Sequence, residues 1–519
     1  MTTLASPLPI ASAYFVLFGR YGEVSRYAQT RGVSRQWIYR EAHSLHTAWR
    51  DQQQHIDDLQ AQLASLQQHN ADLQQRLARA VVLDDDKQAE FASVGQAWGV
   101  SLPLSWALLD VLIPGQGLSV ATLGRRTQAA GTRCGPLLAV FDEFTRARVR
   151  DGAADAIYVK GPVRMIVEPE SLCWVSGRLA DHVDGQGWYE DFRQLPHLEK
   201  LTRDGGSALK KGLQLVNDQR QQNGQPLVVD QGDHFHLLRL GSRSLRQAQQ
   251  QASTTLAAAE EAEKEWQAVH DSGSKAWRGP CQRARRAWEK AEQAMDRWIE
   301  LEHSWDTIKG ALRLITPEGE LNSRQQAHQV LAQIPSTDFA QVTEAVQKKP
   351  EMLAYLDQVQ QKLAALPFAP EVKDAAVRQE CLRRRPQLRR GEGAQAAALR
   401  GVLLVCGVVL SKAGQGVGSA AVAAVRDLFG RAYRASSLVE CLNSVLRMQQ
   451  ARHRKLTQGL LDLKRLYWNS HTFRTGRRRQ TTPYQRLGVP WPEGMTWWDV
   501  LKLSPEQLKD KLSTAKTAA

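Results

Sequence analysis

The sequence predicts a multidomain protein of mixed class, α/β plus α. Helical N-terminal domains precede an α/β core, and a large all-α insertion interrupts that core. Three patterns predict this organisation: residues 51–82 carry a heptad repeat, residues 153–230 alternate between strand and helix periodicity, and residues 233–425 are almost entirely helical in pattern. A chain of 519 residues has room for about three or four domains.

The composition points to a polyanionic partner. Lys and Arg number 68 and Asp and Glu number 54, which gives a net charge of +14, and nucleic acid is the first candidate partner for such a basic chain. The longest apolar run, Val402–Leu410, is well short of the roughly 20 residues that cross a bilayer, so we expect no membrane segment. The N-terminus lacks the basic start of a signal peptide. The six cysteines are scattered without a CxxC pair, which favours a cytoplasmic location and argues against a zinc ribbon.

Residues 1–50 predict a helix-turn-helix domain. Gly22–Thr30 has the pattern of a short helix, Arg31–Val33 that of a tight turn, and Ser34 that of a cap for a helix over residues 35–49. The helix after the turn opens with side chains that suit groove and phosphate contacts. These candidate DNA-binding residues are Arg35, Gln36 and Arg40. The alternative is a three-helix domain with no role in DNA reading.

Residues 51–83 predict a coiled-coil dimerisation segment. Positions a and d of a heptad repeat are filled in turn by Ile56, Leu59, Leu63, Leu66, Asn70, Leu73 and Leu77. Leu dominates position d, and the single Asn at position a favours one register, often that of a parallel pair. The alternative is a helix that packs against its own chain. Asp84–Asp86 ends the repeat and predicts a linker.

Residues 95–150 predict a second helix-turn-helix domain. We expect helices over 104–113, 120–129 and 134–150, with Ser119 as a cap and a turn at Gly131. Arg125 and Arg126 lie near this turn and are candidate DNA contacts. Two such domains in one chain suggest a bipartite DNA site.

Residues 151–232 predict the first part of the α/β core. Three consecutive strands are expected, followed by a helix, a strand, a second helix and a fifth strand. The strands are expected at 153–159, 163–169, 172–180, 198–204 and 226–230, and the helices at 187–195 and 207–217. Three meandering strands followed by this alternation are typical of the start of an RNase H-like α/β fold.

Residues 233–425 predict an α-helical insertion domain. Trp298 and Trp305 are seven residues apart and share a helix face, which favours core packing, although a base-stacking role is also open. Asp233 with the histidines at 234 and 236 is compatible with a metal site, but a structured turn is the favoured interpretation. Gly414–Gly418 lacks the Lys of a phosphate loop and predicts a helix break.

Residues 426–475 predict the final helices of the core, and residues 476–519 a basic tail. A long basic helix pair begins with Glu440, and Asn443 and Arg447 lie on nearly the same face. We expect phosphate contacts from Arg447 and from a cluster further on. That cluster consists of Arg474, Arg477, Arg478 and Arg479.

The order of the strands singles out three acids. Asp155 is in the first strand, and Asp204 ends the fourth, which lies next to the first in an RNase H-like sheet. Glu440 opens a helix that can pack across the same end. Three such carboxylates could hold two Mg²⁺ ions about 4 Å apart, for which Mn²⁺ is expected to substitute. The ions would activate water or a 3′-hydroxyl and stabilise the leaving oxygen.

Three segments carry a family resemblance. VEPESLCW at 167–174, LTRDGGSALKKGL at 201–213 and the region from residue 436 through FRTGRRR to residue 489 resemble bacterial insertion-sequence transposases of the DDE class. The resemblance covers most of the chain, and the helical insertion is hAT-like in layout. It implies a catalytic triad of Asp155, Asp204 and Glu440. The chain departs from the family at Ala156, where an acid is expected. Side chains alternate along a strand, so residue 156 should point away from Asp155.

The resemblance also implies the partners. These are double-stranded DNA, as the terminal inverted repeats of a mobile element and as target DNA, and a second copy of the chain in a homodimer or higher oligomer. The location would be the bacterial nucleoid. Two alternatives stay open: a domesticated, non-catalytic DNA-binding regulator, and an RNase H-fold nuclease that cuts without strand transfer.

Overall fold

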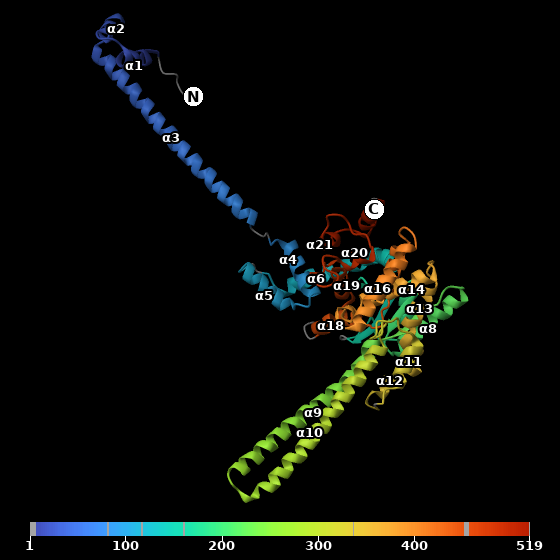
Figure 1. The fold of residues 1–519 in the computed structure, drawn as a ribbon. Coiled ribbons are helices and arrows are strands. Elements are labelled where there is room, and N and C mark those ends of the chain that lie inside the picture. The colour runs from blue at the N-terminus through green and yellow to red at the C-terminus, as the bar shows by residue number, and fades with distance from the viewer. Residues whose placement is uncertain are drawn as a thin grey trace. The chain divides into compact units, whose positions relative to one another are not determined.

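The computed structural model describes residues 7–79, 83–115, 118–158, 161–335, 337–450 and 456–517 (Figure 1). Contacts divide the chain into two units, residues 1–84 and residues 85–519, and each is described by itself. The described residues are mostly helical and include a mixed five-stranded sheet, so the prediction that the chain combines helices with a sheet is confirmed.

The described residues of the N-terminal unit, 7–79 and 83–84, form three helices. They are α1 (Pro7–Phe18), α2 (Glu23–Arg31) and α3 (Arg35–Arg79). Gly32, at φ 67°, forms the turn before α3, and the Ser34 hydroxyl accepts the amide of Trp37 at 3.2 Å, so the predicted turn and cap are both present. Ile38 and Ala42 are buried in the first turns of α3, whereas Arg35, Gln36 and Arg40 are exposed.

The helix predicted over residues 35–49 and the predicted coiled-coil segment form one continuous helix. α3 runs for 45 residues without a break, because no Gly or Pro interrupts it between the two expected pieces. Within the single chain the whole heptad seam is exposed; Leu66, for example, is 65% exposed. Residues 80–82, at the end of the expected coiled coil, lie outside the described part of the chain.

The second helix-turn-helix prediction is wrong at its turn. The region folds as α4 (Asp85–Ala97), α5 (Leu102–Leu112) and α6 (Val120–Arg146). Ser119 caps α6 as predicted, by accepting the amide of Thr122 at 3.1 Å. Gly131 does not turn the chain; it is where α6 contacts the backbone of Gly459, and a Cβ there would stand 2.7 Å from the Gly459 carbonyl oxygen. Glycine at position 131 therefore allows α6 to pack closely against the backbone at Gly459.

The expected linker at 84–86 is also shorter than predicted. Asp85 and Asp86 form the first turn of α4, where carboxylates are stabilised by the helix dipole. Asp86 accepts hydrogen bonds from Lys502, at 2.6 Å, and from the Trp498 indole, at 3.0 Å. This acid therefore fixes the C-terminal segment rather than serving as a free hinge.

All five predicted strands are present, with shifted ends. They are β1 (Asp151–Tyr158), β2 (Pro162–Glu168), β3 (Cys173–Leu179), β4 (Lys200–Arg203) and β5 (Val229–Gly232). The sheet order is β3-β2-β1-β4-β5; β1 is antiparallel to β2 and parallel to β4, and β5 is parallel to β4. Residue 159, the expected end of the first strand, lies outside the described residues.

Helices cover both faces of the sheet. On one face lie α7 (Gly185–Phe192) and α8 (Ser207–Gln222), with the fully buried side chains of Trp188 and Phe192 over Ala154 and Leu201. On the other face, α18 (Ser437–Gln450) and α19 (Gln458–Ser470) pack Val439, Leu442 and Leu461 against Ala153, Ile157 and Met165. The alternation of these two sets along β1 produces the three layers.

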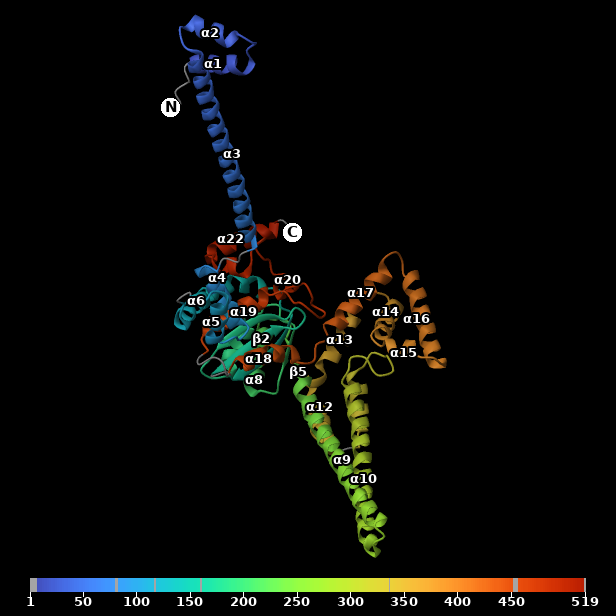
Figure 2. The same ribbon diagram turned by 90° about the vertical axis from the view of Figure 1, so that its left-hand side faces the viewer.

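The insertion begins directly after β5 with a long helical hairpin, α9 (His234–Asp271) and α10 (Arg278–Ala311), joined through η1 (Lys275–Trp277) (Figures 1 and 2). Trp305 is 3% exposed and stacks on Phe339 at 5.3 Å, and Trp298 packs on the same cluster, so both have core roles. The helices that follow are α11 (Arg324–Ala332), η2 (Thr337–Phe339), α12 (Ala340–Lys348), η3 (Pro350–Leu353), α13 (Ala354–Ala364), α14 (Pro370–Arg383), α15 (Pro386–Arg390), α16 (Ala394–Lys412) and α17 (Val417–Gly430).

The apolar run Val402–Leu410 lies inside α16. In the described ranges this is the one helix that is long and apolar enough, by length and composition alone, to cross a membrane. Cys406 and Leu410 pack on α14 and α17 in the core of the insertion, while Leu404 is exposed. The predicted helix break at Gly414–Gly418 separates α16 from α17.

The chain ends in short helices that pack on α6 and α19. They are α20 (Pro483–Leu487), α21 (Trp497–Leu501) and α22 (Pro505–Thr517). A buried ion pair joins α6 to α19: the Arg465 guanidinium contacts the carboxylate of Asp142, and each side chain is only 7% exposed. Arg465 also donates to the backbone oxygen of Trp174 at 2.9 Å and to that of Val175, so it binds both helices to β3.

Candidate active site

The sheet brings two of the three predicted acids to adjacent positions. In the parallel pairing of β1 and β4, Ala154 lies opposite Arg203, so the next residues along the two strands are Asp155 and Asp204. The third acid, Glu440, lies in the first turn of α18, which packs across this face of the sheet. Three segments that are far apart in the sequence thus converge where β4 ends, beside the middle of β1.

Asp155 is held by α18. Its Oδ2 accepts a hydrogen bond from Asn443 Nδ2 at 2.5 Å, and its Oδ1 accepts the amide of Ala156 at 2.8 Å. Burial, together with the neighbouring charges of Asp204 and Glu440, raises the pKa of Asp155 to about 7. The neighbouring residue, Ala156, packs on the opposite face of the sheet, as strand alternation predicts.

Glu440 and Asp204 have different partners. The Arg447 guanidinium lies 3.0 Å from Glu440 Oε2, and the Nε2 of His236 lies 3.7 Å from Oε1, so both carboxylate oxygens of Glu440 face a basic group. Asp204 follows β4 directly, and its Oδ1 accepts the amide of Gly206 at 2.9 Å. This bond fixes the loop that leads into α8.

Asp233 joins the two ends of the insertion. This buried carboxylate caps α9 by accepting the amide of Phe235, and it accepts both the amide and the hydroxyl of Ser436, each at 2.7 Å. It also accepts from His236 Nδ1 at 2.6 Å. Although burial acts to raise the pKa of Asp233, the bonds from His236 and Ser436 hold it below its usual value. Ser436 is four residues before Glu440, so Asp233 anchors the helix that carries the third acid.

The two histidines that follow Asp233 have different surroundings. His234 is fully buried, and its Nε2 lies 2.5 Å from the backbone oxygen of Met352. The hydrogen bond to Asp233 raises the pKa of His236, and that side chain faces the acids. Of the two readings of this motif, the structured turn is confirmed.

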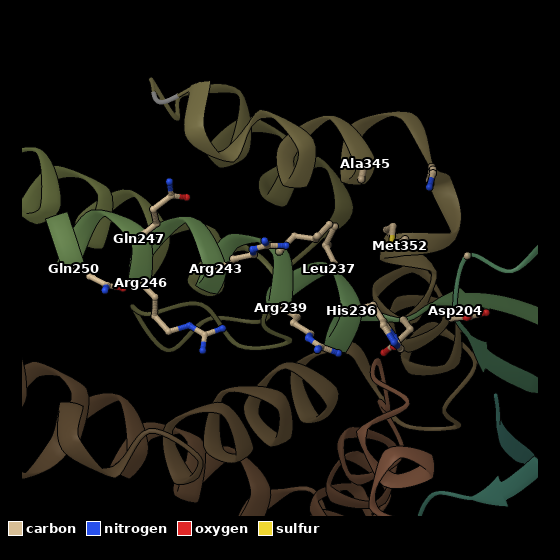
Figure 3. Close-up of a pocket in the computed structure, with 14 residues that line it drawn as sticks. Asp204, His236, Leu237, Arg239, Arg243, Arg246, Gln247, Gln250, Ala345 and Met352 are labelled. Atoms are coloured by element: carbon tan, nitrogen blue, oxygen red, sulfur yellow. The ribbon is translucent and has the colours of Figure 1, made fainter. Parts of the chain in front are cut away.

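A cleft of about 950 Å³ opens beside the acids (Figure 3). Asp204, Asp233 and His236 are among the residues that line it. The other lining residues of α9 are basic or polar, apart from Leu237 and Leu240. Ala345 and Met352 stand on the facing wall. The cleft gives a substrate access to the end of β4.

The donors at this site are those that a hard divalent cation prefers. Three carboxylates supply oxygen, and the Oδ1 of Asn443 is buried beside Asp155 without a hydrogen-bond partner. In the described ranges no three His, Cys, Asp or Glu side chains stand close enough to form a complete metal site. Binding by all three acids therefore requires their carboxylates to move closer together.

The predicted DNA contacts of the N-terminal unit are accessible. Arg35, Gln36 and Arg40 are all exposed on the first turns of α3. Of the pair on α6, Arg125 contacts the hydroxyl of Thr122 at 3.1 Å. Arg126 bonds to Asp85 and Gln88 at 2.8 Å, so it holds α4 against α6 and is not free for phosphate.

The basic residues near the C-terminus also separate into two groups. Arg474, Arg477 and Arg479 are exposed, as phosphate contacts require. Arg478 instead donates to the backbone oxygens of Pro169 and Glu170, at 2.8 and 2.9 Å, and so fixes the turn between β2 and β3. Arg447, which pairs with Glu440, is part of the acid site.

Two groups at the site had no predicted role. The sequence places Asn443 on the same helix face as Glu440 but does not predict its bond to Asp155, and it does not predict that Asp233 anchors α18. A helix-cap pattern at Asp233 is visible in the sequence, but its bond to Ser436 joins residues 203 positions apart, and no local signal reports it.

Neither a family model, nor a curated protein, nor a solved structure matches this chain.

Proposed function

We propose that this chain is a DDE transposase, which cuts the ends of a mobile DNA element and joins them to target DNA. The observation that carries the proposal is the convergence of Asp155, Asp204 and Glu440 where β4 ends, beside the middle of β1. The strand order supports it as well, because three antiparallel strands followed by two parallel ones is the arrangement of an RNase H-like core.

Asp155, Asp204 and Glu440 would hold a pair of Mg²⁺ ions. Bound there, the ions would supply activation of the attacking oxygen and charge stabilisation of the leaving oxygen. Asn443 holds Asp155 in place, and Arg447 and His236 flank Glu440. Two cations would also relieve the repulsion that burial and the neighbouring acids impose on Asp155. The net charge of +14 supports a nucleic-acid substrate.

The test of this function uses the DNA that flanks the gene. A duplex containing its terminal inverted repeat is incubated with the full-length protein in Mg²⁺ or in EDTA. We expect a Mg²⁺-dependent nick at the repeat boundary, and a joined product when target DNA is added. Nicking without joining would indicate a nuclease, and binding without nicking would indicate a non-catalytic regulator; either result contradicts the proposal.

The exposed seam of α3 supports self-association as a parallel pair. Asn70→Leu should stabilise the oligomer and loosen its choice of partner number, because the polar side chain no longer penalises other registers. Conversely, Leu66→Asp should convert the protein to a monomer. Light scattering of the full-length variants measures both effects, with Gln68→Asp, at position f and away from the seam, as the control. A wild-type protein that is monomeric at high micromolar concentration would contradict the dimer.

Gln36 should contribute to sequence discrimination, whereas the C-terminal arginines should not. If Gln36 makes a bidentate base contact, Gln36→Ala weakens binding to the element end by about 1–3 kcal/mol relative to random DNA. Replacing Arg474, Arg477 and Arg479 with Gln should weaken binding to all sequences alike and reduce the salt dependence. Equilibrium binding to both DNAs measures this. Equal losses on every sequence for both variants would show that the roles are assigned wrongly.

A further inference from the structure

The first four turns of α9 carry a row of basic and polar side chains that begins at the acid site. His236 is followed by Arg239, Arg243, Arg246 and Gln250, with spacings of three, four, three and four. With 3.6 residues per turn, this spacing keeps them on one helix face. Figure 3 shows the row in sequence along α9, with Asp204 beyond the His236 end.

The opposite face of α9 is occupied by core contacts. Gly241, Ala248 and Ala252 are buried there, and a Cβ at Gly241 would stand 2.1 Å from the Trp305 ring. This packing fixes the rotation of the helix about its axis. The row of arginines is consequently held toward the cleft.

The arginines of the row are exposed and have no acidic partner. In the described ranges no ion pair includes Arg239, Arg243 or Arg246, and the only side-chain bond among them runs from Arg246 Nε to the Ser242 backbone oxygen at 3.3 Å. Lys349 adds positive charge to the facing wall of the same cleft. Three uncompensated guanidinium groups along a groove are the electrostatic complement of a phosphodiester backbone.

We propose that this row is a track for the DNA strand whose phosphodiester bond reaches the acids. The destination of the strand rests on the proposed function, but the binding itself does not. From His236 to Gln250 the helix rises about 21 Å, at 1.5 Å per residue. One strand of DNA advances about 3.4 Å per nucleotide, so the track would contact the backbone of roughly six nucleotides beside the cut. The helical insertion would then position the strand as well as complete the fold.

The test measures the salt dependence of DNA binding by the full-length protein, with a short duplex of random sequence and no divalent ion. Replacing Arg239, Arg243 and Arg246 with Gln should reduce the slope of log Kd against log salt by about 2 to 3, since each lost phosphate contact removes about 0.7 to 0.9. Replacing the same three residues with Lys should retain most of the slope, because the charges remain.

The control removes the same charge elsewhere on the hairpin. Arg278, Arg283 and Arg286 are exposed in the first turns of α10. Their replacement with Gln should leave the slope within about half a unit of the wild-type value. Circular dichroism confirms that each variant is folded. An unchanged slope in the Arg239, Arg243 and Arg246 variant would overturn the track and leave the cleft for another anionic occupant, such as an acidic protein segment. An equal loss in the control would show a general charge effect and would also overturn it.

Measurements of DNA cleavage distinguish a failure of the proposed track from a failure of the proposed function. With wild-type protein cutting in Mg²⁺, the Gln variant should raise KM for the element end about 10-fold or more, with a smaller effect on kcat, because it loses binding that is common to ground and transition states. If Asp204→Asn cuts normally, the proposed function fails whatever the slope. If Asp204→Asn is inactive and the slope is unchanged, only the track fails.

Discussion

Asp204→Asn should reduce Mg²⁺-dependent nicking of the element end by about 10³-fold or more, while binding of that DNA stays within a few-fold. The substitution keeps the shape of the side chain, including an oxygen that can accept the Gly206 amide, but removes a charge that the cation pair needs. Glu440→Gln and Asp155→Asn should have the same effect. Single-turnover nicking of an end-labelled duplex measures the loss.

The pattern across variants is as informative as the size of the loss. Asp218→Asn is a matched control, since Asp218 lies on α8 in the same unit and far along the helix from Asp204. The Asp218→Asn variant should nick the DNA at the wild-type rate. Full nicking by Asp204→Asn would end the DDE interpretation. Full nicking by Asp155→Asn alone would mean that another first carboxylate acts, with Glu168 and Asp181 the next to test.

Arg465→Met should lower the free energy of unfolding by about 3–5 kcal/mol, the largest stability effect we expect from a single substitution. Among the described residues, the change leaves the buried carboxylate of Asp142 with Arg146, at 3.1 Å, as its basic partner. It also removes a donor from the backbone oxygen of Val175 and one of the two donors, the other being Asn469, from that of Trp174. Denaturant unfolding followed by tryptophan fluorescence measures the change.

Two further variants test the cause of that loss. Arg193→Met makes the same substitution in an exposed pair with Glu190, where the cost should be within about 1 kcal/mol. Combining Arg465→Met with Asp142→Leu should recover part of the loss, because the buried carboxylate is removed, while Arg146, whose side chain is 32% exposed, can be hydrated. A cost below about 1 kcal/mol for Arg465→Met would contradict the structural role given to this pair.

The sheet was predictable because its signals are local. Alternating or continuous apolar runs such as VRMIVE at 163–168 mark strands by their own residues, and short polar connections mark the ends. The same applies to Ser34 and Ser119, whose hydroxyls cap the helices that begin beside them. The two acids of β1 and β4 could be placed together because strand order fixes their neighbours.

The failures involve residues whose partners are distant in the sequence. Gly131 has the local appearance of a turn, yet it is helical because Gly459 packs against it. Arg126 and Arg478 have the appearance of free basic residues, but each is held by groups that only the folded chain supplies. The bond between Asp233 and Ser436 was not predictable for the same reason: its partners are distant in the sequence, and no periodicity or local motif encodes it.

Asp155, Asp204 and Glu440 should form one cation site, and iron-mediated cleavage of the protein tests this. Fe²⁺ substitutes for Mg²⁺ in oxygen-ligand sites, and with ascorbate and peroxide it cuts the backbone near the bound ion. We predict cuts close to Asp155, Asp204 and Glu440 together, suppressed by excess Mg²⁺ and absent in Asp204→Asn. Cuts confined to other segments, or cuts near these three that persist in Asp204→Asn, would contradict the site.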